Sequence, residues 1–193
     1  MTNAGIDLWW IPLGAGGHFV RFNGRVYEAL QAWRERRPRL DLYHSALEVH
    51  TQDGRYVIEN AWPIPVADGS TRGVVVEGPV FSRMLGRTRI LRYEVRRWHD
   101  GTIFDASYAT DGPVRVSRSP QQAAKLLDLV AEVPAHVWGR KVPDTEEMWN
   151  SNSVVSWLLT RAGLDVDGLA LPQGGRAPGW RSGINVARLS PPN

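Results

Sequence analysis

Residues 147 to 164 read EMWNSNSVVSWLLTRAGL, and small polar residues at 150–153 stand directly before an apolar run at 154–159. Short polar side chains accept hydrogen bonds from the free N–H groups of a first helical turn, so the pattern predicts a helix N-cap, with Gly163 at the helix end. The same position suits a nucleophile, because the dipole and the free N–H groups can hold an oxyanion there. The pattern leaves both interpretations of Ser151 open: capping and chemistry.

A serine nucleophile needs a base, and His44 is the candidate because an imidazole can take the hydroxyl proton. Glu59, Asn60 or Tyr43 could orient the ring, which would complete an arrangement of nucleophile, base and orienting group. Such groups are recognised by geometry, so distance along the chain is no obstacle. Taken alone, a histidine such as His44 is more often a half-buried residue that forms a structural hydrogen bond.

The elements that must position these residues follow from local patterns. Alternating residues at 40–51, a Gln-Asp-Gly turn and a second run at 55–62 predict a β-hairpin that carries His44 on one strand. Further strands are expected at 72–78 and 89–99. Helices are expected at 25–37, at 119–133 with Ser119 as N-cap, and at 149–162. This order predicts an α+β domain with an antiparallel sheet and little parallel pairing.

The motifs YHSALEV, DGRYVIE and, about a hundred residues later, NSNSVV resemble those of the permuted papain-like hydrolases. These include the PPPDE peptidases and the lecithin:retinol acyltransferase and NlpC/P60-related branch. His44 falls on the histidine of those families, and Asn150, Ser151 and Asn152 fall on their Asn, Cys and Asn. The resemblance covers about residues 40 to 160. It implies one papain-like domain over 1–193 that acts as a hydrolase (a peptidase or amidase) or an acyltransferase on an amide, ester or thioester, without a cofactor.

The chain departs from those families because Ser151 stands where they have Cys, and the whole sequence contains no Cys. Three accounts remain open: a natural serine nucleophile, which we favour, an engineered Cys-to-Ser change, or a degenerate domain that only binds. The main alternative function is therefore a non-catalytic binding module.

In the catalytic interpretation Ser151 attacks, His44 takes its proton, and Glu59 or Asn60 orients the ring. The expected substrate-binding residues are Tyr43, Trp149, Asn150, Asn152, Arg176 and Trp180. The last two lie in the Gly- and Pro-rich tail at 170–193. This tail is either a lid, in which an arginine pairs an anion and a tryptophan covers an apolar group, or an irregular surface segment.

The composition is that of an ordinary globular chain, with 42% hydrophobic and 22% charged residues and a net charge of +3. Arginines cluster between 83 and 97 and could meet phosphates or an acidic partner, but the alternation there is typical of an exposed strand, so nucleic acid is not expected.

The histidines lack metal-ligand spacing. A small-molecule, lipid or peptide (isopeptide) substrate is expected. No apolar run or signal segment is present, so we expect a cytoplasmic protein without a membrane span; the oligomeric state is left open.

Overall fold

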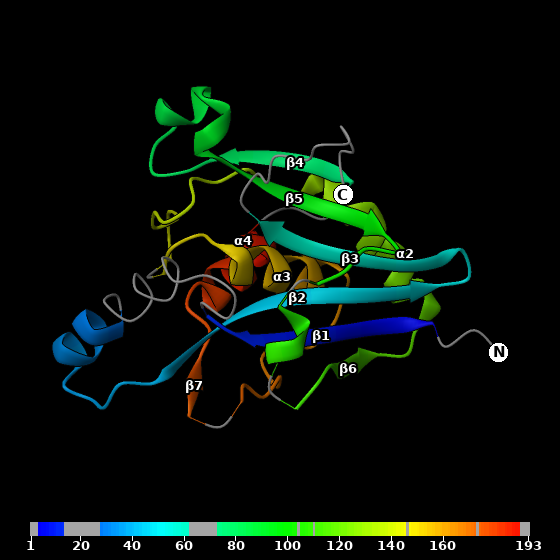
Figure 1. Cartoon of the computed structure of the whole chain (residues 1–193), viewed down its shortest axis with the longest axis horizontal. Helices are drawn as coiled ribbons and strands as arrows, with labels where there is room; N and C mark the ends of the chain where they lie inside the picture. Colours follow the sequence, from blue (N-terminus) through cyan, green and yellow to red (C-terminus); the bar gives the residue numbers. More distant parts are fainter. Residues whose placement is uncertain are drawn as a thin grey trace.

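An antiparallel sheet with helices packed against one of its faces forms the body of the protein (Figure 1). The computed structural model describes residues 4–13, 28–61, 73–103, 105–109, 111–145, 147–172 and 174–189. The strand order is β4-β5-β3-β2-β1-β6, and the short β7 pairs in parallel with β2. The expected α+β class with an antiparallel sheet is confirmed.

Two of the strands, β2 and β3, form the predicted hairpin. They comprise β1 (Gly5–Pro12), β2 (Asp41–Thr51), β3 (Gly54–Ala61), β4 (Val74–Pro79), β5 (Arg92–His99), β6 (Val114–Ser117) and β7 (Gly175–Arg176). Strands β2 and β3 pair up to Thr51 and Gly54, so the Gln-Asp-Gly turn lies where the sequence predicts it. The sheet places β2 near its centre, between β3 and β1.

The described helices are residues 28–35, α2 (Pro120–Leu129), α3 (Ser151–Arg161) and α4 (Trp180–Leu189). Helix α2 begins as predicted, because the Ser119 side chain accepts a hydrogen bond from the backbone of Gln122 and Pro120 occupies the first turn. The first residues of the expected helix at 25–37 lie outside the described residues. None of the helices within the described ranges is long and apolar enough to cross a membrane.

Helix α4 corrects the expectation that the tail is either a lid or an irregular segment. Its face of Ser182, Gly183, Ile184, Val186 and Ala187 is buried, so from Trp180 onward the tail is an integral helix. A Cβ atom on Gly183 would lie 2.1 Å from the Ser153 carbonyl oxygen. The glycine therefore allows α4 to approach α3 more closely than any larger residue would.

The two faces of the sheet have different surroundings. Alternate residues of the central strands, including Leu8, Leu47 and Val49, belong to the large core that contains α2, α3 and α4. The other set, including Ile11 and Ala46, belongs to a smaller cluster with Val57 and Ile103. We call these the helix face and the second face of the sheet.

Strand β5 begins three residues later than the sequence predicts. Residues 89–91, expected as strand, form the second of two 3-10 turns, η1 (Leu85–Arg87) and η2 (Arg89–Leu91). The connection from β4 to β5 folds back on itself through local backbone bonds, including Gly86 N–H to Ser82 O at 3.1 Å and Leu91 N–H to Thr88 O at 3.0 Å. It forms the green turns beyond the ends of β4 and β5 (Figure 1).

Candidate functional site

Helix α3 begins with a reciprocal capping box. The side-chain oxygen of Asn150 accepts hydrogen bonds from the backbone N–H groups of Asn152 (2.9 Å) and Ser153 (3.3 Å). In return, the Ser153 hydroxyl accepts from the Asn150 backbone N–H at 3.1 Å. The predicted cap is confirmed, and it satisfies the backbone donors that a helix start leaves free.

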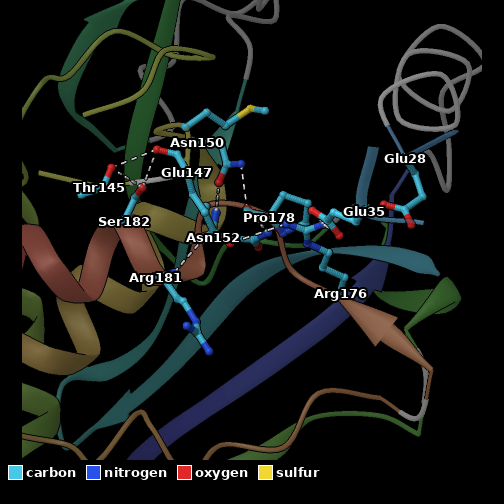
Figure 2. Close-up of polar contacts among 12 residues, drawn as sticks. Glu28, Glu35, Thr145, Glu147, Asn150, Asn152, Arg176, Pro178, Arg181 and Ser182 are labelled. Carbon is cyan, nitrogen blue, oxygen red and sulfur yellow. Dashed lines mark hydrogen bonds and ion pairs between the residues drawn. The ribbon is translucent and has the colours of Figure 1, made fainter. Parts of the chain in front are cut away.

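Asn152 joins α3 to two distant segments. Its amide nitrogen donates to the carbonyl oxygens of Tyr43 on β2 and Pro178, each at 2.9 Å, while its amide oxygen accepts from the Ser45 hydroxyl at 2.8 Å. The Asn150 amide also donates to the Pro178 carbonyl at 2.8 Å, and both amides point at Pro178 in Figure 2. The side chain of Asn152 is fully engaged in holding these segments together.

The serines after Asn152 attach α3 to the start of α4. The Ser153 hydroxyl donates to the Gly179 carbonyl and the Ser156 hydroxyl to the Trp180 carbonyl, each at 2.7 Å. Gly179 itself has φ +86°, and a Cβ there would lie 2.5 Å from the Asn150 amide oxygen. The polar motif thus positions α4 as well as capping α3.

Ser151 is the exception within the motif. It is the first residue of α3 and 7% exposed. Among the described residues, no hydrogen bond involves its hydroxyl. Its position at a helix N-terminus is the one that the sequence predicts for a nucleophile, and its hydroxyl is not needed for the cap.

His44 lies on the second face of the sheet, away from α3. In the β1–β2 register Ser45 lies opposite Trp10, and His44 lies opposite Ile11. Ser45 contacts Asn152, which fixes the helix face, so the neighbouring His44 side chain points to the other side. Burial lowers the pKa of His44 to about 4, and no described residue hydrogen-bonds its ring. By this alternation His44 faces away from α3, so the register does not favour the expected pairing of His44 with Ser151.

The two expected orienting residues have other surroundings. Glu59 lies opposite Arg96 on β5 and accepts a hydrogen bond from its guanidinium at 3.1 Å; the same buried arginine bonds Glu94 at 2.7 Å. Asn60 alternates with Glu59 and so lies on the helix face, where its amide atoms are buried without a hydrogen-bond partner. Neither residue bonds the ring of His44.

The remaining expected binding residues serve the fold. Trp149 is fully buried and packs edge-on against His136, with ring centroids 4.8 Å apart. Trp180 packs against Trp10 at 4.9 Å, and the buried ring of Tyr43 lies against Gly175. All three aromatic rings therefore pack against other parts of the fold.

Arg176 already has carboxylate neighbours within the chain. Its guanidinium lies 3.4 Å from Glu35 and 4.0 Å from Glu147 (Figure 2). Glu147 also accepts a hydrogen bond from the backbone N–H of Arg181 in the first turn of α4. The anion that we expected Arg176 to meet is therefore supplied here by the protein's own acidic side chains.

The described acidic and histidine side chains do not form a metal-binding cluster. Within the part of the chain that the structure describes, no three His, Asp or Glu residues are grouped closely enough to hold a metal ion.

The comparisons add no relative on which a function could rest. No family model matches the sequence, and neither the curated proteins nor the solved structures yield a match. What can be inferred about function therefore depends on the geometry of the chain itself.

Proposed function

We propose that this chain is a non-catalytic binding module, a degenerate member of the papain-like type. The papain-like assignment rests on the resemblance of its motifs. It is supported by an antiparallel sheet that packs against a helix starting at Asn150-Ser151-Asn152. The observation that carries the non-catalytic part is the contact of Ser45 with Asn152, because alternation along β2 then turns the adjacent His44 to the face of the sheet opposite to α3.

A general base must come within about 3 Å of the proton that it removes, directly or through one water. A histidine on the far side of a sheet does not meet that requirement for Ser151. The other polar groups of the motif, on Asn150, Asn152 and Ser153, are engaged in hydrogen bonds that hold the fold. Three of the four residues at 150–153 thus have a structural explanation that needs no catalysis.

The second candidate is a serine hydrolase or acyltransferase acting on an amide, ester or thioester. One observation favours it: the Ser151 hydroxyl has no partner among the described residues, although it lies at the start of α3. An unactivated alcohol is negligibly ionised at neutral pH, so this candidate requires a base on the helix face.

A fluorophosphonate probe separates the two candidates. The binding module predicts no labelling above that of Ser151→Ala, which is a matched control because Asn150, and not Ser151, caps the helix. Both proteins should unfold at nearly the same temperature. Labelling of the wild-type chain that Ser151→Ala abolishes would overturn the non-catalytic proposal and favour the hydrolase.

Ser151→Cys gives a second test, since a thiolate is a far stronger nucleophile than an alcohol. If no base reaches this position, the thiol should react with iodoacetamide no faster than free cysteine. Because a helix N-terminus alone also lowers the pKa of a thiol, only a faster reaction that His44→Ala abolishes would show that His44 activates residue 151 and would count against the binding module.

A further inference from the structure

The connection between β4 and β5 exposes an unusual number of apolar side chains. We call residues 80–91 the β4–β5 lobe. Within it Phe81 is 58% exposed, Met84 81%, Leu85 46% and Ile90 77%. Single exposed apolar residues are common on protein surfaces, but several gathered in one short segment indicate a surface that contacts an apolar environment.

Positive charge is concentrated in the same segment. The lobe contains Arg83, Arg87 and Arg89 and no Asp or Glu, so its charge of +3 equals the net charge of the whole chain. The side chains of Arg83 and Arg87 are exposed, and neither forms an ion pair with a described residue. Arg92, just after the lobe, is by contrast paired with Glu77 at 2.7 Å.

The lobe is held by its contacts with the rest of the protein. The Arg92 guanidinium donates to the Gly86 carbonyl at 2.7 Å, and the Phe81 N–H donates to the Trp138 carbonyl at 3.2 Å. Phe81 has φ +63°, a left-handed conformation that a bulky residue adopts only where the surrounding structure holds it. The backbone is thus fixed in a form that leaves the apolar side chains outside the core.

We propose that the β4–β5 lobe docks the protein on an anionic phospholipid membrane. Met84, Leu85 and Ile90 enter the boundary between headgroups and acyl chains, and Arg83 and Arg87 contact lipid phosphates. Charge complementarity argues for an anionic surface, because the lobe holds cations without any carboxylate of its own. This inference does not depend on the proposed function, which concerns α3.

The shape and chemistry of the lobe favour lipid over other anionic partners. The lobe projects beyond the ends of β4 and β5 (Figure 1), as a segment that enters a headgroup layer must. Its exposed apolar residues are mainly aliphatic, and aliphatic side chains cannot stack on nucleic-acid bases as aromatic rings do. An acidic protein surface would satisfy the arginines but would leave Met84 and Ile90 against polar groups.

Vesicle co-sedimentation of the full chain tests the proposal. The protein should bind vesicles of phosphatidylcholine mixed with phosphatidylserine, and much less to pure phosphatidylcholine. Each arginine near an anionic surface contributes about 1 kcal/mol, so Arg83→Gln with Arg87→Gln should lower the partition coefficient about 30-fold. Met84→Ser with Ile90→Ser should lower it at least tenfold at unchanged charge.

Matched controls have the same change in charge or hydrophobicity elsewhere on the surface. Arg118→Gln with Lys125→Gln removes two exposed cations near or on α2, and Leu30→Ser with Leu189→Ser removes two exposed apolar residues, from the helix at 28–35 and from α4. Both should bind vesicles as the wild-type chain does, and a thermal melt of each variant verifies that it is folded.

Three outcomes would overturn the proposal. The first is a wild-type protein that does not bind phosphatidylserine vesicles, and the second is a set of lobe variants that bind no more weakly than the controls. Alternatively, binding to polyglutamate beads without binding to vesicles would show that the lobe meets an acidic protein surface instead. None of these results alters the labelling experiment at Ser151, so the two proposals fail separately.

Discussion

Replacing Asn152 by alanine should destabilise the protein more than any other change in the polar motif. Its buried amide forms three hydrogen bonds outside α3, to Tyr43, to Pro178 and from Ser45. Each intramolecular hydrogen bond contributes about 1 kcal/mol net, and losing one partner leaves the other buried and unpaired. We therefore expect the free energy of unfolding to fall by about 3 kcal/mol, a large fraction of the roughly 5–15 kcal/mol typical of a domain.

Urea denaturation followed by circular dichroism measures this loss. With a slope of about 2 kcal/mol per molar urea, the midpoint of Asn152→Ala should shift down by about 1.5 M. Ser151→Ala is the matched control one residue away, and its midpoint should barely move because its hydroxyl has no described partner.

A double-mutant cycle with Ser45→Ala identifies the contact itself. Because Ser45 and Asn152 share one hydrogen bond, the double variant should be about 1 kcal/mol less destabilised than the sum of the single variants. Equal midpoints for Asn152→Ala and Ser151→Ala, or strict additivity in the cycle, would refute the role given to Asn152.

Two further predictions concern the sheet and the helix pair. The pKa of His44 is lowered to about 4 in the folded chain, against about 6.5 in the unfolded chain. As pH falls, the unfolded state therefore binds a proton first, and the free energy of unfolding should decline between about pH 6.5 and pH 4. His44→Gln should lose this part of the slope in pH-dependent denaturation, and an unchanged slope would contradict the burial of a neutral ring. Gly183→Ala should cost about 1–3 kcal/mol because its methyl group would lie 2.1 Å from the Ser153 carbonyl oxygen. Gly168→Ala, whose methyl group would lie 3.6 Å from the Asp165 carboxylate, should unfold nearly as the wild type does.

The elements with local signals could be predicted from the sequence. An Asp-Gly turn between two alternating runs specifies the β2–β3 hairpin through its own backbone preference. Ser119 and Asn150 begin helices because their side chains satisfy donors two or three residues away. These interactions depend on neighbours in the chain, so the sequence contains what is needed to infer them.

The face on which His44 lies depends on the whole sheet, but the alternation of residues along β2 indicates it in the sequence. In YHSALEVH one alternate set is Tyr43, Ser45, Leu47 and Val49, and the other begins with His44 and includes Glu48 and His50. The first set is the more apolar and therefore the one to be covered by helices. Short motifs shared with another family carry no information on this alternation, so the resemblance implies a pairing of His44 with Ser151 that the strand register does not favour.

The C-terminal helix illustrates the opposite case, in which local composition misleads. Gly, Ser and Pro around Trp180 predict irregular structure, because glycine and serine are weak helix formers. In α4 those small residues are required by the close approach to α3, where Gly183 and Ser156 leave no room for larger side chains. Tertiary packing overrides the propensity, and single-sequence patterns do not record that packing.

The hydrogen bonds of Asn152 also make the segment from Pro178 onward part of the folding unit. The Asn152 amide reaches back to Tyr43, more than a hundred residues earlier, and forward to Pro178, 26 residues later. A chain cut before Pro178 would keep β2 and α3, but it would leave the amides of Asn150 and Asn152 without this acceptor and would uncover the side of α3 on which α4 packs. Such a truncated chain would therefore lose stability in the sheet and in α3 as well as at the cut.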